Sequence, residues 1–314
     1  MKIITTAILL GVTLLAVPLF SYFFGTALSP LEWNALTTLI TIAVIAIAAT
    51  FIVGELNNNN SQVDKIWSLL PIVYAWVATD YSHYAPRLVM MSCLVTLWGI
   101  RLSINFGLKG AYQWRFWGGE EDYRWAVLRE KPEFNPKWKW TLFNLFFICG
   151  YQNVLILLFT LPTIVVLQHS NMPIGLFDYM AAGLMFVFIV YETIADIQHL
   201  KFQNIKWAKV KAGKELNEHK KGFLDTGLWA HSRHPNYFAE QAIWVCFYLF
   251  SEIASGECIN WSIAGCLLLI VLFHGSSNLS EELSSGKYTE YASYQKRVPR
   301  FIPFIGKIFL RSDK

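Results

Sequence analysis

The sequence predicts an all-helical, polytopic membrane protein, and two features of its composition lead to that class. Hydrophobic residues make up 54% of the 314-residue chain, whereas charged residues make up only 15%. Soluble domains carry roughly a quarter charged residues, so this deficit argues against an ordinary soluble domain. The apolar residues also gather into runs near the roughly 20 residues that a helix needs to cross a bilayer. We therefore expect a transmembrane helical bundle of about seven or eight spans.

The apolar runs give eight candidate spans. Most are long enough for a bilayer core of about 30 Å, and the third, which is short, needs its flanking residues to reach the interfaces. In chain order, the predicted spans are Ile3–Phe24, Ala35–Val53, Ile66–Thr79, Arg87–Leu108, Trp140–Gln168, Gly175–Ile197, Pro235–Ala254 and Cys258–Gly275.

The positive charges predict the orientation of these spans, because Lys and Arg are enriched in cytosolic loops. With eight spans, one face receives all of the 26 Lys and Arg residues except Arg87 and Arg101. We therefore expect both termini in the cytosol, in a bacterial inner membrane or an ER-type membrane. The polar tract Asn57–Gln62 is then expected to be a flexible cytosolic turn.

The small net charge of +4 bears on the partners. Because the basic residues are spread over loops, nucleic acid is not an expected partner. We expect membrane lipids and a lipid-like small molecule instead, and no feature of the sequence predicts a protein partner.

The most informative stretch is Gly227–Gln241, GLWAHSRHPNYFAEQ, which lies between the basic loop and an apolar run. Pro is favoured at the first position of a helix, so we expect a helix to begin at Pro235. Free N–H groups at that helix start, with the fork of Arg233 beside them, predict a site for a large anionic ligand. An interfacial anchor at headgroup level is the alternative. The first two turns carry Asn236, Tyr237, Glu240 and Gln241.

A second polar group lies inside the sixth span. Glu192, Asp196 and His199 recur at helical spacing and share one face. They are suited to a ribose hydroxyl, to the basic loop Lys201–Lys214 or, less well, to a metal ion, and we predict no metal site. The alternative is a ladder of salt bridges to Arg101 or Arg233.

Two further segments carry polar residues outside the spans. The mixed-charge run Glu120–Arg124 is expected to be a solvated loop, unless it folds back as a lid. Near the C-terminus, Tyr288, Tyr291 and Tyr294 recur every three residues and precede basic residues, including Arg297. Such a face can stack a flat ring, with Tyr291 as our candidate, or it can lie on lipid headgroups.

Several stretches together resemble one family, and they run from about Asp64 to the end of the chain. They are DKIWSLLP from Asp64, WGIRL from Trp98, EEDYRW from Glu120, ETIADIQHLKF from Glu192, SRHPNYFAE from Ser232 and YTEYASYQKRVPRFIPF from Tyr288. With these stretches the sequence is similar to DUF1295 proteins, a branch of the steroid 5-alpha-reductase-like membrane enzymes. Isoprenylcysteine carboxyl methyltransferases carry related RHPNY and RVPRFIP segments.

The resemblance implies an NADPH-dependent membrane oxidoreductase that reduces a carbon–carbon double bond conjugated to a ketone in a steroid- or isoprenoid-like lipid. It implies a two-span segment at 1–63 and a reductase-like domain at 64–314, whose C-terminal part, from about 175 to 314, binds the cofactor. Asp196, Asn236, Tyr237 and Glu240 match positions that line that site. Our own candidates for the cofactor phosphates, chosen on charge and placement, are Lys220, Lys221, Arg233 and Arg297.

Reduction of an enone also needs a group that stabilises the developing enolate oxygen. In the steroid reductases a Glu and a Tyr hold that oxygen, and the resemblance places these positions near Asp64 and Trp98. An indole cannot act as an acid, so Asp64 and Tyr74 become the candidate proton donors. The alternatives are a methyltransferase that uses S-adenosylmethionine on an isoprenylated or phospholipid acceptor, and a non-catalytic lipid-binding protein.

Overall fold

The computed structural model describes residues 25–115, 117–134 and 136–303. All regular secondary structure in these ranges is helical, which confirms the predicted all-α class. The first predicted span, Ile3–Phe24, lies outside the described residues, so the two-span N-terminal segment stays a prediction.

The described residues divide into two compact units. The larger unit holds residues 25–183 and Cys246–Leu269, and the smaller unit holds Leu184–Val245 and 270–303. Three long helices contribute residues to both units. Both units therefore combine segments that are distant in the sequence.

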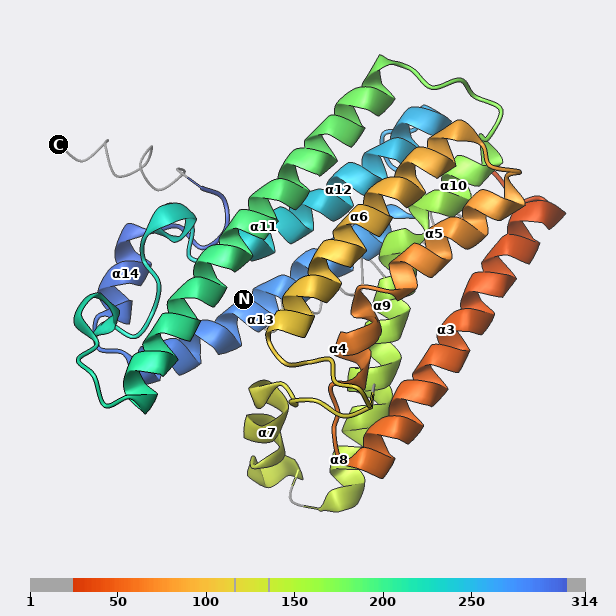
Figure 1. The fold of residues 1–314 in the computed structure, drawn as a ribbon. Coiled ribbons are helices and arrows are strands. Elements are labelled where there is room, and N and C mark those ends of the chain that lie inside the picture. Colours follow the sequence, from red (N-terminus) through yellow and green to blue (C-terminus); the bar gives the residue numbers. More distant parts are fainter. Residues whose placement is uncertain (1–24, 116, 135, 304–314) are drawn as a thin grey trace. The chain divides into compact units, whose positions relative to one another are not determined.

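The larger unit is a bundle in which α5 packs on α6, and α3 packs on α5, α9 and α10 (Figure 1). Short helices lie beside these long ones at one end. In chain order its helices are α3 (Pro30–Asn57), α4 (Gln62–Trp67), α5 (Leu70–Tyr81), α6 (Pro86–Leu108), α7 (Tyr123–Arg129), η2 (Pro132–Phe134), α8 (Lys137–Phe143), the π-helix η3 (Asn144–Tyr151), α9 (Gln152–Thr160) and α10 (Pro162–Gln168).

The remaining helices build the smaller unit. The three long ones among them also contribute residues to the larger unit. They are α11 (Leu176–Lys211), η4 (Asn217–His219), η5 (Gly227–Ala230), α12 (Pro235–Ser255), α13 (Ile263–Lys287) and α14 (Tyr291–Arg297). The helix start predicted at Pro235 is confirmed.

Five helical segments of the described chain are long and apolar enough to cross a membrane: Pro30–Asn57, Pro86–Leu108, Lys137–Gln168, Leu176–Lys211 and Ile263–Lys287. Each overlaps a predicted span, although α11 and α13 both run well past the predicted ends. This agrees with a multi-pass membrane protein.

Two predicted spans are not among these five. The span predicted at Ile66–Thr79 is divided between α4 and α5. Pro71 has no N–H for the carbonyl of Trp67, the last residue of α4, so the helical hydrogen-bond pattern is interrupted between α4 and α5. The span at Pro235–Ala254 does form the single helix α12, but its first turns carry Asn, Glu and Gln.

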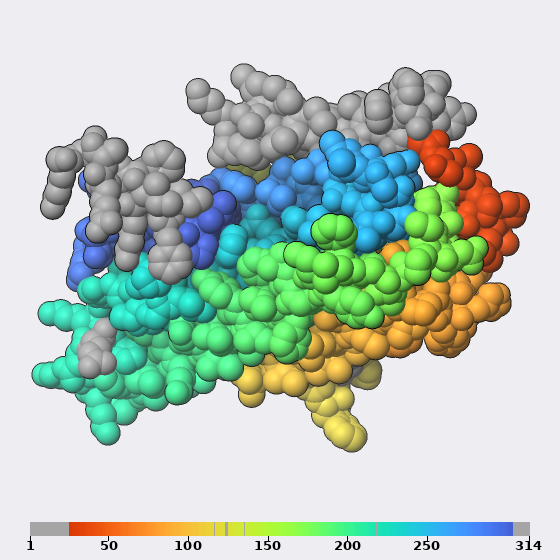
Figure 2. All heavy atoms as spheres, turned by 90° about the horizontal axis from the view of Figure 1, so that it is seen from above, coloured from red at the N-terminus to blue at the C-terminus, as the bar shows by residue number. Residues whose placement is uncertain are grey.

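Helix α11 has its polar residues inside and its apolar residues outside. Glu192 and Asp196 are 5% and 6% exposed, whereas Ile194 and Ile197 are 45% and 53% exposed. Figure 2 shows this helix, coloured green to teal, open along the surface. A soluble protein places these residue types the other way round, so this arrangement suits a helix in contact with lipid.

The polar tract Asn57–Gln62 was expected to be a flexible cytosolic turn, but most of the tract is packed against other residues of the larger unit. Four of its six residues, Asn59, Asn60, Ser61 and Gln62, are buried. The side chains of Asn59 and Gln62 donate hydrogen bonds to the carbonyls of Gly119 and Trp117, each at 3.1 Å. Because those carbonyls are 60 and 55 residues away in the chain, the local sequence carries no signal of the burial.

The mixed-charge run Glu120–Arg124 folds over this tract. The Glu121 carboxylate accepts from the Asn60 N–H at 2.8 Å, and the Asp122 N–H donates to the Ser61 hydroxyl at 2.9 Å. Beneath the loop, Lys65 is only 1% exposed and donates to the carbonyl of Gly118. Burial lowers the pKa of the Lys65 ammonium, while the charge of Asp64 acts in the opposite direction.

A buried ion pair joins α6 to the first turn of α11 within the larger unit. Arg87 Nε and Nη2 donate to the two carboxylate oxygens of Asp178 at 2.6 and 2.9 Å. Arg87 is 4% exposed and Asp178 is fully buried. The same carboxylate accepts from the Gly175 N–H at 2.9 Å, ahead of α11. The Asp178 carboxylate therefore binds the Arg87 guanidinium and also holds the backbone at the start of α11.

We predict that Asp178→Ala destabilises the protein by about 3–5 kcal/mol, because it leaves the Arg87 guanidinium buried without its counter-charge. The measurement is unfolding of the detergent-solubilised full chain by heat or denaturant. Asp80→Ala removes an exposed carboxylate at the end of α5 and serves as the control. Equal stability of the two variants would contradict a structural role for the ion pair.

Candidate functional site

The candidate site begins with the polar face of α11 in the smaller unit. Glu192 and Asp196 are buried on this face, and His199 follows one turn later, half-buried. The predicted sharing of one helix face is therefore confirmed in α11. Among the described residues, no three His, Cys, Asp or Glu side chains converge as a metal site would require.

The loop before α12 docks on this helix through specific hydrogen bonds. The Leu228 N–H donates to Gln198 Oε1 at 3.0 Å, and Trp229 Nε1 donates to the Ala195 carbonyl at 3.1 Å. The Trp229 ring stacks on His199 with ring centroids 5.1 Å apart. Gly227 has φ +63°, and a Cβ at this position would lie 2.7 Å from the Gln198 amide, so glycine is strongly favoured there.

The first turns of α12 then meet α11. Asn236 Nδ2 donates to Asp196 Oδ1 at 3.3 Å, and Phe238 packs edge-to-face on Phe188, with ring centroids 5.7 Å apart. Asn236 Oδ1 is buried and has no hydrogen-bond partner among the described residues. One turn on, Glu240 is 4% exposed and accepts from the Trp244 indole at 3.1 Å. Two polar motifs 40 residues apart therefore join at the Asp196–Asn236 contact.

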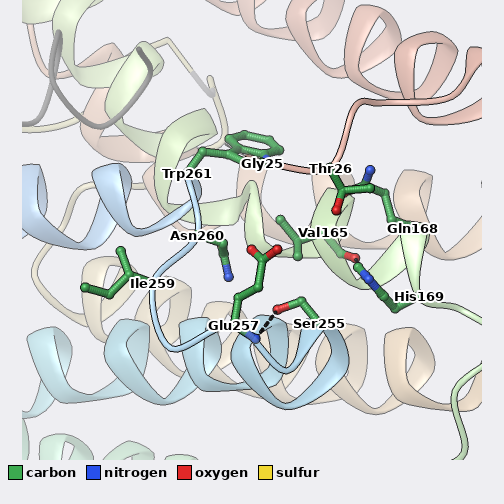
Figure 3. A pocket seen from close by; sticks show the side chains of 10 residues that line it. All are labelled: Gly25, Thr26, Val165, Gln168, His169, Ser255, Glu257, Ile259, Asn260 and Trp261. Carbon is green, nitrogen blue, oxygen red and sulfur yellow. Dashed lines mark hydrogen bonds between the residues drawn. The ribbon is translucent and has the colours of Figure 1, made fainter. Parts of the chain in front are cut away.

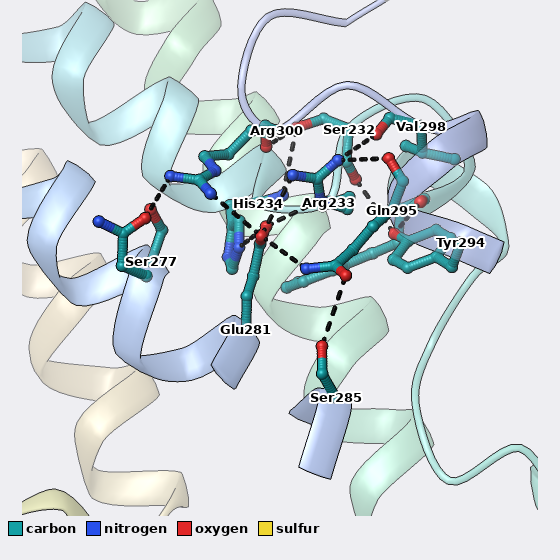
Figure 4. Close-up of polar contacts among 12 residues, drawn as sticks. Ser232, Arg233, His234, Ser277, Glu281, Ser285, Tyr294, Gln295, Val298 and Arg300 are labelled. Atoms are coloured by element: carbon teal, nitrogen blue, oxygen red, sulfur yellow. Dashed lines mark hydrogen bonds and ion pairs between the residues drawn. The ribbon is translucent and has the colours of Figure 1, made fainter. Parts of the chain in front are cut away.

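A second polar cluster, centred on Glu281 of α13, ties this loop to the C-terminal segment (Figure 4). The Glu281 carboxylate, 3% exposed, accepts from Arg233 at 2.8 and 3.2 Å and from Arg300 at 3.2 Å. It also accepts from Gln295 Nε2 at 3.0 Å and lies 3.0 Å from His234 Nε2. We call these five residues the Glu281 cluster.

The protonation of His234 follows from its burial. Burial lowers the pKa of the His234 imidazole below its ordinary value of 6.5, although its hydrogen bond to Glu281 and the charge of that carboxylate act in the opposite direction. We therefore treat the ring as neutral near pH 7, with its Nε2–H donated to Glu281. The charges of the cluster are then two guanidinium groups and one carboxylate.

Backbone hydrogen bonds complete the link between the loop and the C-terminal segment. The N–H groups of Arg233 and His234 donate to the carbonyls of Pro299 and Arg300 at 2.9 and 3.0 Å. The SRHPNY and RVPRF segments are therefore paired through both backbone and side chains.

Comparison with known proteins assigns the chain to a family. The model of the family described as "Protein of unknown function (DUF1295)" matches residues 50–298. The chain belongs to the DUF1295 family. It is also 35% identical, over 286 residues, to an uncharacterized protein of Schizosaccharomyces pombe, an alignment that covers 83% of this chain and 79% of the relative. No solved structure matches the chain.

In this DUF1295 protein, Arg233 does not present the free fork that its charge led us to expect. Nε and Nη2 are held by Glu281, and Nη1 donates to the carbonyls of Gln295 and Val298. Four of its five N–H donors are thus used inside the protein. The proposed contact of Arg233 with a phosphate has little support from this geometry.

The tyrosines of the C-terminal segment also turn inward. Tyr291 and Tyr294 are 5% and 1% exposed and form a small core with Phe223 and Val298. Burial raises the pKa of the Tyr291 hydroxyl to about 12. Tyr291 is therefore packed against protein side chains, and in this conformation it offers no open face for a cofactor ring.

The other predicted phosphate ligands remain at the surface of the smaller unit. Lys220 and Arg297 are exposed. Lys221 pairs with Asp225 at 2.6 Å, and its side chain is 40% exposed. Tyr237 stacks on His234 with centroids 5.2 Å apart, at the edge of the Glu281 cluster. Of the predicted phosphate ligands, Lys220, Lys221 and Arg297 are therefore the ones accessible from solvent.

The predicted catalytic residues all lie in the larger unit. Asp64 is half-buried on α4, and its carboxylate accepts from the Trp125 indole at 3.3 Å. Tyr74 of α5 and Trp98 of α6 are fully buried. Tyr74 Oη has no hydrogen-bond partner among the described residues. Their assignment as catalytic groups stays a prediction.

Sequence analysis did not assign a role to Glu281, Gln198 or Lys65. Glu281 and Glu282 are adjacent, yet the first is buried in the cluster and the second is exposed. A weak signal existed for Glu281 and Lys65: the first is a carboxylate at the end of an apolar run, and the second is a Lys beside the Asp of the DKIW segment. Neither signal identifies a partner.

We predict that Glu281→Gln destabilises the smaller unit by about 3–5 kcal/mol, because the Arg233 guanidinium then stays buried without its carboxylate. Limited proteolysis should cut the segment after α14 at least several times faster than in the unchanged protein, since that segment is tied down through Glu281. Glu282→Gln removes the neighbouring exposed carboxylate and is the matched control. Identical proteolysis and melting for both variants would show that the cluster does not hold the segment.

Proposed function

We propose that this protein is a multi-pass membrane oxidoreductase that uses NADPH to reduce a carbon–carbon double bond conjugated to a ketone in a steroid- or isoprenoid-like lipid. The observation that carries the proposal is the Asn236 amide. One end of it is held by Asp196, and the other end is buried with no partner among the described residues. Buried polar atoms are almost always satisfied, so a ligand group is expected there.

The residues around this amide fit a nucleotide cofactor. Asp196 accepts hydrogen bonds, as a ribose hydroxyl requires, and Asn236 Oδ1 can accept one from a carboxamide or a second hydroxyl. We assign Asp196, Asn236, Tyr237 and Glu240 to the nucleoside. The exposed cations Lys220, Lys221 and Arg297 are assigned to the phosphates.

When bound, NADPH supplies a hydride to the β-carbon of the enone. The chain must supply a hydrogen-bond donor or acid for the ketone oxygen, on which negative charge develops. Tyr74 fits this role because its buried hydroxyl has no partner among the described residues. Asp64 is the second candidate, and Trp98 can add only an indole N–H.

The proposed topology has seven or eight spans with both termini in the cytosol. It rests on the five membrane-length helices of the described residues and on the distribution of Lys and Arg. The membrane is a bacterial inner membrane or an ER-type membrane. The cofactor then enters from the cytosol and the lipid substrate from the bilayer.

One observation favours a second candidate, a membrane methyltransferase that uses S-adenosylmethionine. That ligand carries no phosphate, and Arg233 and Arg300 are both bound to Glu281. The positive charge available for a dinucleotide is therefore smaller than the sequence suggests. The same nucleoside-binding residues would serve S-adenosylmethionine.

We predict that the purified full chain binds NADPH more tightly than NADH or S-adenosylmethionine by calorimetry. Asn236→Ala and Glu240→Ala should each abolish detectable binding while the protein stays folded and inserted. Asn204→Ala, on an exposed position of α11, removes the same amide and should leave binding unchanged.

The pattern of binding separates the candidates. Binding of S-adenosylmethionine alone assigns the site to the methyltransferase reaction, and no binding of any of the three points to a non-catalytic lipid-binding protein. Normal NADPH binding by both alanine variants would place the cofactor elsewhere.

We further predict that Asp64→Asn lowers the rate of enone reduction by at least tenfold while changing the affinity for NADPH by less than about twofold. The amide keeps the size of the side chain but cannot donate a proton as an acid. Single-turnover reduction and equilibrium binding are measured on the same preparation. Equal losses in rate and affinity would assign Asp64 to the cofactor instead.

A further inference from the structure

A cavity of about 240 Å³ lies in the larger unit, and none of the candidate site residues lines it. Its walls come from the end of α10, the end of α12, the connection from α12 to α13, and the residues just before α3 (Figure 3). The polar side chains that line it include Thr26, Gln168, His169, Glu257 and Asn260. It is large enough for several water molecules or a small polar group.

The charge of this cavity is negative. Among the described residues that line it, Glu257 is the one charged side chain. Figure 3 shows its carboxylate in the middle of the cavity, among Val165, Asn260 and Trp261. The carboxylate has no hydrogen-bond or ion-pair partner in the part of the chain that the structure describes, and its backbone N–H is fixed by the Ser255 hydroxyl at 3.2 Å.

Beside Glu257, the His169 ring offers a further hydrogen-bond acceptor to a ligand. His169 Nδ1 lies 2.9 Å from the Val165 carbonyl and must donate to it, which makes Nε2 an acceptor in the neutral ring. The Asn260 side chain is held by its neighbours, since its amide nitrogen donates to Ser251 and its oxygen accepts from Ser262. The cavity therefore combines a carboxylate and an imidazole nitrogen, which suits a donor-rich cation.

The geometry favours a primary ammonium over a quaternary one. A quaternary ammonium has no N–H groups and is recognised by a cage of aromatic rings, whereas Trp261 is the one ring other than His169 among the described lining residues. A primary ammonium donates three hydrogen bonds and can use both Glu257 and His169. Val165 and Ile259 supply apolar walls for the carbon chain that bears it.

The position of the cavity along the helices points to the source of the ligand. It lies where α10 ends and where the chain enters α3, and both belong to segments long and apolar enough to cross a membrane. The ends of such helices lie at the depth of lipid headgroups. We propose that this cavity binds a primary ammonium group, carried by a phosphatidylethanolamine headgroup or by a soluble amine of the same chemistry.

The test uses native mass spectrometry of the full chain with phosphatidylethanolamine or phosphatidylglycerol of identical acyl chains. We expect the first lipid to be retained at least about tenfold over the second, which is the effect of one charge-assisted hydrogen bond. Glu257→Gln should remove this preference, whereas Glu257→Asp should keep part of it. Asp80→Asn removes an exposed carboxylate elsewhere in the same unit and should behave as the unchanged protein.

A parallel titration with free ethanolamine, followed by thermal stability, identifies the source. Stabilisation that depends on Glu257 supports the site and assigns it to soluble amines, and lipid preference without that stabilisation supports the site and assigns it to the headgroup. Equal retention of both lipids without ethanolamine binding, or an unchanged preference in Glu257→Gln, would overturn the proposal. Because no nucleotide enters the assay, its outcome is independent of the proposed reductase activity.

Discussion

Every charged or polar side chain buried in this apolar bundle needs a partner, and this requirement shapes both units. In an environment of low polarity, an unpaired charge costs several kcal/mol, so buried charges occur in matched sets. Arg87 and Asp178 form such a set in the larger unit, and the residues around Glu281 form another in the smaller unit. Both sets join segments far apart in the sequence, and the folded arrangement depends on them.

The same requirement identifies where a ligand is expected. Asn236 Oδ1 and Tyr74 Oη are buried and have no partner among the described residues, although most polar groups around them are satisfied. Each lies on a residue that the sequence also selects. The Asn236 amide is bound to Asp196 through Nδ2, while its Oδ1 is buried with no partner among the described residues, so the proposed nucleoside contact would satisfy it.

Length and composition were sufficient to predict most of the long helices, because a membrane span is a local property of the chain. The helix start at Pro235 and the shared face of Glu192 and Asp196 are local in the same sense. The roles of the basic residues were not predictable in this way. The charge of Arg233 is evident from the sequence, but its partner Glu281 lies 48 residues further along the chain. Glu282, the neighbouring glutamate, is exposed. The burial of Asn59–Gln62 was missed because its partners are more than 50 residues away.

The two ends of the larger unit differ in charge, as the two sides of a membrane protein usually do. Within the larger unit, α3 begins beside the cavity that contains Glu257 and ends at the tract covered by the loop Glu120–Arg124, and its 28 residues span about 42 Å. Loops at the second end contain Lys and Arg, whereas no such residue lines the cavity among those described. In the proposed orientation, in which the positive-inside rule directs the basic end to the cytosol, the cavity belongs to the opposite leaflet. In that orientation the proposed ammonium ligand would reach the cavity from the non-cytosolic leaflet.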